Sequence, residues 1–345
     1  MPGTEMTLSP PTLADVAQAA GVSSATASRV LNGSPRVRPT TRRQVEEAMA
    51  RLGYVRNRAA RSAGPRRTGV IALVVCEAES KLFSDAYFSR ILRGVRRELT
   101  HGEQHYGEQQ LVLLTAEAAS EYRAAARYLR SGHVDGAMFV SMHGRHRMDL
   151  ESIGIPIVFC GRPVSGAGTL SYVDADNRAG GTLAARHLIA SGRKVVATVA
   201  GPPDMAPGVD RLRGYREAVA NARMSDAGLI VYGDFSQISG EHALYRLLDR
   251  RPDIEAVFAA SDLMAAGVLR ALHRTGRKVP DDVAVVGFDD SPLARHTMPQ
   301  LTTIRQPIEE MGARMVNELV SLVGGADRGP RCTVFGTELV LRASA

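Results

Sequence analysis

The sequence predicts a small all-α domain followed by an α/β core of two doubly wound parallel-sheet lobes. Near the N-terminus, the apolar spacing predicts two short helices joined by a tight turn. From Val70 onward, apolar runs of strand length alternate with helical stretches, which is typical of parallel sheets with crossover helices. At 345 residues, the chain is too long for one compact core. These observations indicate a small domain and a larger two-lobed body.

The composition is that of a soluble protein. Hydrophobic residues make up 44% of the chain and charged residues 23%, and no apolar run reaches the roughly 20 residues that span a bilayer. The first residues lack a basic segment followed by an apolar one, so we expect no secretory signal and a cytoplasmic location. Cys76, Cys160 and Cys332 lie far apart without C-x-x-C spacing. We therefore expect buried free thiols, with no disulfide and no zinc site.

The net charge of +7 is concentrated at one end of the chain. Residues 1–67 hold 11 arginines against 4 acidic residues, whereas the other 278 residues carry 32 basic and 32 acidic groups. This distribution is typical of a domain that binds a polyanion, attached to a neutral body. A solvated basic tail is the alternative.

The N-terminal domain begins with two short helices. Thr12 precedes an apolar stripe of helical spacing, and Asp15 completes a capping signature three residues later. Gly21 ends this helix, and Ser23 can cap a second helix that runs to about Leu31. Two helices with so short a connection predict a helix-turn-helix.

The second helix carries residues that suit DNA recognition. In a helix-turn-helix, the N-terminal residues of the second helix enter the major groove. Ser24 and Ala25 lie there, and Ser28 and Arg29 follow one turn later on the same face. Arginine can reach guanine or phosphate, and alanine can touch a thymine methyl group. A bundle with solvated arginines is the alternative, but it leaves the small polar outer face unexplained.

A third helix closes the N-terminal domain. Pro39 stands near its first turn and Gly53 marks its end. Its apolar stripe, which faces the first two helices, consists of Val45, Ala48, Met49 and Leu52.

The core is predicted from seven apolar runs of strand length. They cover residues 70–75, 111–115, 136–140, 156–160, 195–200, 256–259 and 284–288. Helical stretches separate these runs, which favours parallel strands joined by crossovers. In two doubly wound lobes, the carboxyl ends of the strands face a shared cleft, where small ligands bind.

The N-terminal domain resembles the headpiece of the LacI/GalR family of bacterial transcriptional regulators. The resemblance rests on residues 12–33, TLADVAQAAGVSSATASRVLNG, and on residues 52–57, LGYVRN. It continues to the C-terminus, with residues 301–306, LTTIRQ, as a hallmark. The core accordingly resembles the periplasmic sugar-binding protein fold that members of this family carry.

The resemblance implies the domain boundaries. The headpiece covers residues 10–56, a hinge helix and linker cover residues 57–67, and the effector-binding and dimerisation core covers residues 68–345. The first lobe takes residues 68–172 and 303–345, and the second takes residues 173–302. An apolar strand pattern at residues 334–341 ends the first lobe, and no heptad helix follows that would form tetramers.

By the same resemblance, Ser24, Ala25 and Arg29 are the base-reading positions. Phosphate contacts fix the position of a protein on DNA rather than its sequence preference. The residues that the resemblance assigns to phosphate contacts are Thr12, Ser23, Asn32, Tyr54 and Asn57.

The linker at residues 57–65 resembles the hinge helix of the family. Arg61 would contact phosphate there, and Ala63 stands where most members carry a leucine that wedges between base pairs. Alanine is too short to wedge deeply, and Gly64 and Pro65 weaken and end a helix. We therefore expect shallow bending of the DNA.

Seven candidate effector-binding residues lie at or beyond the ends of strands. They are Tyr87, Phe88, Arg162, Arg211, Phe235, Ser261 and Asp289. The resemblance implies that Arg211 reaches ligand hydroxyl or carboxylate groups with its planar fork, and that Asp289 makes a second polar contact. Ser261 replaces an asparagine common in sugar-binding members, so the identity of the ligand stays open.

Each of these candidates has a structural alternative. Arg211 can form a surface ion pair with Asp210 or Glu217, and Asp289 can cap a turn. The aromatic residues can be plain core, although their ring faces suit the C–H face of a sugar or a planar base.

Nothing in the sequence nominates an enzyme. It lacks a G-x-S-x-G elbow, a phosphate-binding G-x-x-x-x-G-K-S/T loop and a G-x-G-x-x-G after the first core strand. The histidines at positions 101, 105, 143 and 146 have no carboxylate or cysteine at ligand spacing, so we expect ordinary loop or surface residues. We expect no cofactor and no metal.

The sequence thus predicts a homodimeric, sequence-specific DNA-binding regulator that reads a palindromic operator. The resemblance favours a repressor of sugar-utilisation genes, controlled by a sugar bound between the lobes. A purine- or nucleoside-responsive regulator is the nearer alternative. A sugar-binding protein without DNA function is the other, but the localised charge and the absent signal count against it.

Overall fold

The structure is a computed structural model that describes residues 13–31, 34, 37–52, 67–102, 107–144, 153–164, 168–325 and 329–345. The chain divides into two compact units, Met1–Arg66 and Arg67–Ala345. We call the first unit the headpiece and the second the core.

The headpiece contains the three predicted helices, α1 (Leu13–Ala19), α2 (Ser24–Leu31) and α3 (Pro39–Leu52). Gly21 adopts the left-handed conformation expected of a residue that ends a helix, with φ of 65°. The Ser23 hydroxyl accepts the backbone N–H of Thr26 at 3.2 Å, which confirms the predicted cap of α2. The small apolar core of the unit consists of Val16, Ala17, Ala27, Val30, Val45 and Ala48.

The first lobe of the core is built on a six-stranded parallel sheet with strand order β11-β5-β4-β3-β1-β2. Its strands are β1 (Val70–Val75), β2 (Gln110–Thr115), β3 (Gly136–Val140), β4 (Ile157–Cys160), β5 (Ser171–Ala175) and β11 (Cys332–Phe335). Its helices are α4 (Glu79–Ser84), α5 (Ala86–His101), α7 (Ala119–Arg130) and α12 (Ile308–Val323). Residues of α5 and α12 pack on one face of the sheet and residues of α7 on the other.

The second lobe has a six-stranded sheet with strand order β12-β10-β9-β8-β6-β7. Its strands are β6 (Val196–Ala200), β7 (Ile230–Tyr232), β8 (Ala256–Ala259), β9 (Ala284–Asp289), β10 (Thr302–Arg305) and the antiparallel edge strand β12 (Glu338–Val340). Its helices are α8 (Asn177–Ala190), α9 (Ala206–Asn221), α10 (Gln237–Arg250), α11 (Asp262–Arg274) and the 3₁₀ helix η3 (Pro292–Arg295). Helices cover both faces, so both lobes have the predicted doubly wound arrangement.

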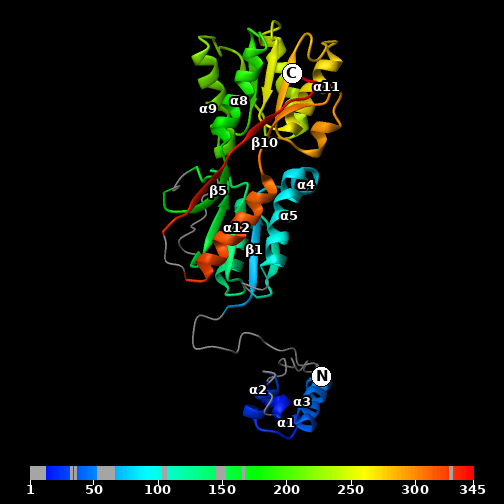
Figure 1. The fold of residues 1–345 in the computed structure, drawn as a ribbon, viewed down its shortest axis with the longest axis vertical. Coiled ribbons are helices and arrows are strands. Elements are labelled where there is room, and N and C mark those ends of the chain that lie inside the picture. The colour runs from blue at the N-terminus through cyan, green and yellow to red at the C-terminus, as the bar shows by residue number, and fades with distance from the viewer. Residues whose placement is uncertain are drawn as a thin grey trace, which may run out of the picture. The chain divides into compact units, whose positions relative to one another are not determined.

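The lobe boundaries differ from the predicted ones. Strand β5 lies wholly in the first sheet, although the second lobe was expected to begin at residue 173, and β10 lies in the second sheet. The prediction of a single terminal strand at residues 334–341 in the first lobe is wrong. Residues 332–335 form β11 in the first sheet and residues 338–340 form β12 in the second. The C-terminal segment, red in Figure 1, accordingly runs from one lobe to the other. Each strand covers a sheet edge that would otherwise expose unpaired backbone groups.

Close backbone packing fixes α9, which carries Arg211, against α8. A Cβ atom on Gly181 of α8 would lie 2.2 Å from the Arg211 carbonyl oxygen, and one on Gly214 would lie 2.1 Å from the carbonyl oxygen of Arg178. Only glycine permits such an approach at these two positions. The helix pair therefore presents Arg211 in a defined place.

Two further expectations can be compared with the structure. Cys76 and Cys160 are buried free thiols, as expected, but Cys332 is exposed, because exposed and half-buried residues alternate along β11 and Cys332 lies on the exposed face. Among the residues that the structure describes, no helix is both long and apolar enough to cross a membrane.

Candidate functional site

The headpiece presents the predicted DNA-reading residues on one helix. Ser24, Ala25 and Arg29 on α2 are exposed and Ser28 is half-buried, while Ala27 and Val30 on the opposite face are buried. Ser23 is exposed just before the helix. The small residues at the start of α2 leave room for close approach to a groove, and Arg29 supplies a long donor one turn later.

Several predicted DNA contacts cannot be compared with the structure. Thr12, Asn32, Tyr54, Asn57, Arg61 and Ala63 lie outside the described residues.

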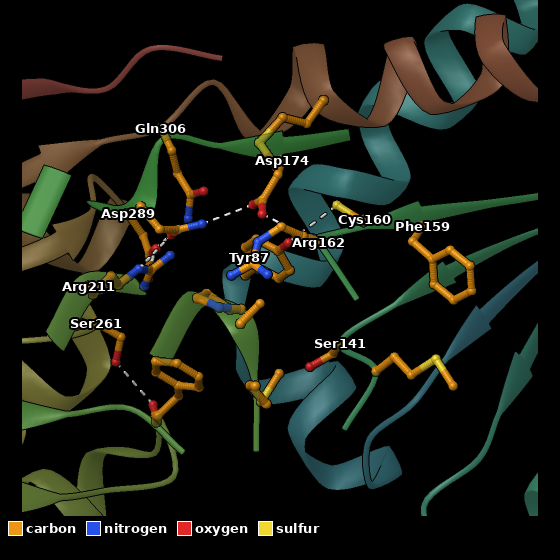
Figure 2. Close-up of a pocket in the computed structure, with 18 of the residues that line it drawn as sticks. Tyr87, Ser141, Phe159, Cys160, Arg162, Asp174, Arg211, Ser261, Asp289 and Gln306 are labelled. Atoms are coloured by element: carbon orange, nitrogen blue, oxygen red, sulfur yellow. Dashed lines mark hydrogen bonds and ion pairs between the residues drawn. The ribbon is translucent and has the colours of Figure 1, made fainter. Parts of the chain in front are cut away.

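In the core, a cavity lies between the two lobes at the carboxyl ends of the strands. The space between its walls is about 780 Å³, a volume that includes open solvent at the mouth. All seven residues that the sequence singled out line this cavity: Tyr87, Phe88, Arg162, Arg211, Phe235, Ser261 and Asp289. They come from α5, from α9, from the loops after β4, β7 and β8, and from the end of β9. Figure 2 shows the polar groups facing one another.

Arg211 is the best-anchored polar group of the cavity. It is 5% exposed, its Nε donates to Oδ1 of Asn177 at 2.8 Å, and its Nη1 donates to the carbonyl oxygen of Ala260 at 2.6 Å. The guanidinium lies over the ring of Phe288, 3.6 Å from its centroid. The predicted alternative of a surface ion pair is therefore wrong, because the side chain is buried and Nη1 lies 3.5 Å from Oδ1 of Asp289.

Asp289 ends β9 and adopts an uncommon backbone conformation. Its φ is 110° and that of Asp290 is 45°, in a region where non-glycine residues are strained. The Gln306 side-chain amide donates to Oδ1 of Asp289 at 2.6 Å. Burial raises the pKa of Asp289 to about 6, although the nearby Arg211 opposes this shift. The carboxylate therefore faces the cavity, whereas the structural alternative was that it caps the following turn.

The first lobe contributes a second polar group. Asp174, at the end of β5, accepts the backbone N–H of Arg162 at 2.8 Å and the side-chain amide of Asn177 at 2.9 Å. Burial raises its pKa. The Arg162 guanidinium crosses to the second lobe and donates to Oδ2 of Asp210 on α9 at 2.8 Å.

Aromatic side chains form the apolar walls. Phe88 and Phe235 are 4% and 8% exposed, and Tyr87 packs edge-on against Phe88 with ring centroids 5.4 Å apart. The backbone of Phe235 has a positive φ of 71°, and its carbonyl oxygen accepts the Ser261 hydroxyl at 3.3 Å. These aromatic residues thus combine packing in the lobes with a surface that faces the cavity.

Other hydrogen bonds join the lobes near the cavity. Lys81 of α4 donates to the carbonyl oxygen of Asp234 in the second lobe at 3.2 Å. His143 lies in a loop, in line with the expectation of a loop or surface residue, but its side chain is buried. Its Nδ1 lies 3.0 Å from Oδ2 of Asp204 and its Nε2 lies 3.4 Å from Oε1 of Glu77. Among the described residues, no group of His, Cys, Asp and Glu is arranged to hold a metal ion.

Sequence reasoning missed several residues of the cavity. Those with polar side chains are Lys81, Asp85, Ser141, Asp174, Asn177 and Gln306. Asp174 lies in a strand that was not predicted and Asn177 follows that strand, whereas Gln306 ends the hallmark LTTIRQ segment and could have been proposed from it.

The raised pKa of Asp289 predicts a pH dependence of stability. The folded protein holds this proton more tightly than the unfolded chain, whose aspartates titrate near pH 4, so stability falls as the pH rises from about 4 to 6. The wild type should therefore lose on the order of 3 kcal/mol of its free energy of unfolding over this window. Asparagine does not titrate, so we expect Asp289→Asn to lack this loss when the core is unfolded in urea at each pH. Asp249→Asn on the exposed face of α10 is the control, and equal pH slopes in the two variants would refute the assignment.

Known proteins are similar to this chain over nearly its whole length. Residues 12–57 match the sequence model for bacterial regulatory proteins of the lacI family, and residues 185–345 match that for a periplasmic binding protein-like domain. The HTH-type transcriptional regulator CelR of Thermobifida fusca is 46% identical over 338 residues, which are 97% of this chain and 98% of that protein.

Two solved structures have similar folds. A complex of the transcriptional regulator CelR with cellobiose matches with a TM-score of 0.78 and 44% identity, over 97% of this chain and 100% of that one. The lac repressor dimer bound to operator and the anti-inducer ONPF matches with a TM-score of 0.78 and 28% identity, over 97% of this chain and 99% of that one.

Proposed function

The chain belongs to the LacI family of bacterial regulatory proteins and is a DNA-binding transcriptional regulator, and we propose that it is a repressor of sugar-utilisation genes. In this proposal a homodimer places two headpieces on a palindromic operator, with half-sites about 34 Å apart. A sugar binds in the cavity between the lobes and weakens operator binding. A β-linked glucose disaccharide of the cellobiose type is the first candidate.

The observation that carries this proposal is the chemistry of the interlobe cavity. Arg211 offers fixed donors beside the carboxylate of Asp289, and Asp174 offers acceptors from the other lobe. Alternating donors and acceptors suit the hydroxyl groups of a sugar, and the rings of Phe235 and Tyr87 suit its C–H faces. The similarity of the whole chain to a regulator solved with cellobiose supports the same ligand class.

A thermal-shift panel tests the proposed ligand class. A ligand that binds only the folded state stabilises it by RT ln(1 + [L]/Kd), about 2.7 kcal/mol at a hundredfold excess over Kd. We expect cellobiose or another sugar to raise the melting temperature of the core, and guanine, hypoxanthine and adenosine to leave it unchanged. Stabilisation by a purine alone would contradict the proposal and favour the purine-responsive alternative.

The hinge gives a prediction about DNA bending. Because Ala63 is short and Gly64 follows it, we expect Ala63→Leu to bind operator more tightly and to bend it more sharply than the wild type. Energy transfer between dyes at the two ends of an operator fragment measures the bend. Equal bending by wild type and variant would show that the wild-type hinge is not shallow.

A further inference from the structure

Arg90 joins the two lobes behind the effector cavity. It lies on α5 of the first lobe and is mostly buried, with 14% of its side chain exposed. Its Nε and Nη2 donate to the two carboxylate oxygens of Glu309 on α12, at 2.9 and 2.8 Å. Its Nη1 crosses to the second lobe and donates to the carbonyl oxygen of Asp289 at 3.0 Å and to that of Asp290 at 3.4 Å. The paired contact with Glu309 fixes the direction of the remaining nitrogen.

The two carbonyl groups belong to the strained turn that carries the effector carboxylate. Positive φ values at Asp289 and Asp290 are uncommon for non-glycine residues and persist only where the surroundings hold them. The Asp290 side chain is held within the second lobe by Arg305 and Arg342. Among the described contacts, Arg90 supplies the hydrogen bonds from the first lobe to the backbone of this turn.

Both the side chain and the backbone of Asp289 are therefore held by the segment at the start of α12. Its carboxylate accepts the side-chain amide of Gln306, and its carbonyl oxygen accepts Arg90, which Glu309 orients. Gln306 precedes α12 and Glu309 lies in its first turn, so one short segment fixes the side chain directly and the backbone through Arg90. A change in the angle between the lobes would alter the contact from Arg90, because that contact spans them.

We propose that Arg90 is a positioning residue for effector recognition: oriented by Glu309, it holds the Asp289 turn so that the carboxylate faces the effector. The proposal rests on the proposed function, in which Asp289 binds the sugar. It also makes sugar binding depend on the relative placement of the lobes, since the donor and the two carbonyl acceptors lie in different lobes.

The test separates the donated hydrogen bonds from the ion pair. Arg90→Met removes both, whereas the charge swap Arg90→Glu with Glu309→Arg retains opposite charges but leaves no donor at position 90. Arg93→Met is the matched control, because Nη1 of Arg93 lies 3.6 Å from Oε1 of the same Glu309 and the side chain is 70% exposed. Among the hydrogen bonds of the described residues, none joins Arg93 to the Asp289 turn. Affinity for the sugar found in the panel is measured by calorimetry on the full-length protein, and stability by urea unfolding.

We expect Arg90→Met to weaken sugar binding at least tenfold and Arg93→Met to leave it within twofold of wild type. We expect the charge swap to recover the unfolding midpoint without recovering sugar affinity. Sugar affinity within twofold of wild type in Arg90→Met, or recovery of affinity by the charge swap, would overturn the proposal.

A double-mutant cycle tests the coupling between Arg90 and the Asp289 turn without any ligand. If Arg90 positions the Asp289 turn, Arg90→Met and Asp289→Asn change the free energy of unfolding non-additively, whereas independent sites give additive changes. Additive shifts would contradict the positioning role. Failure of the wild type to bind any sugar would instead contradict the proposed function, and the cycle would still report on Arg90.

Discussion

Replacing Arg211 by alanine is expected to abolish sugar binding and to lower the free energy of unfolding of the core by about 3–5 kcal/mol, because it removes one partner of a buried charge pair. The substitution leaves Asp289 buried beside an empty space and takes a donor from Asn177 and from the carbonyl oxygen of Ala260. Calorimetry measures the loss of sugar binding in Arg211→Ala, and unfolding in urea measures the loss of stability.

Two further variants make this prediction specific. Arg211→Lys keeps the charge but loses the planar fork, so we expect a smaller loss of stability and still at least tenfold weaker sugar binding. Arg213→Ala removes an exposed arginine of the same helix that pairs with Glu217, and we expect almost no change in either quantity. Sugar affinity retained in Arg211→Lys would argue that the fork does not contact the ligand.

Arg29→Ala is expected to weaken operator binding strongly while leaving the fold of the core and its effector binding unchanged. The residue is exposed on α2, and loss of an arginine contact to a base costs about 1–3 kcal/mol of discrimination. Operator affinity is measured at a fixed salt concentration beside that for an unrelated sequence, because the phosphate contribution varies steeply with salt.

Arg43→Ala is the matched control for this experiment. Arg43 is exposed on α3, so its removal takes the same charge from the same unit but not from α2. We expect a small loss that is equal for operator and unrelated DNA. If Arg29→Ala also lost affinity equally for both sequences, Arg29 would contact phosphate rather than a base.

The sequence predicted the architecture well where strands are apolar and helices amphipathic. The seven apolar runs all became strands, because a strand buried on both faces needs continuous apolar residues. Strand β10, Thr302–Arg305, escaped prediction because its buried residues include two threonines. Their hydroxyl groups are satisfied by tertiary partners, Asp262 for Thr303 and the backbone N–H of Arg342 for Thr302, and no local pattern reveals these.

The candidate site was predictable only in part, for a similar reason. Arg211 and Asp289 stood out by residue type and by place after a strand or in a recognisable motif. Asp174 did not, because its role depends on Arg162 and Asn177, which reach it through the fold. The hydrogen bond from Arg90 to the Asp289 turn joins residues far apart in the chain and in different lobes, so it could not be predicted from the sequence.

The central claim is that a sugar in the interlobe cavity controls operator binding. The direct measurement is the operator dissociation constant of the full-length protein at fixed salt, with and without saturating cellobiose or whichever sugar stabilises the core. Coupling between two sites is typically about 1–3 kcal/mol, so the account predicts a 5- to 150-fold weakening of operator binding. An operator affinity that is unchanged although the sugar is bound would contradict it.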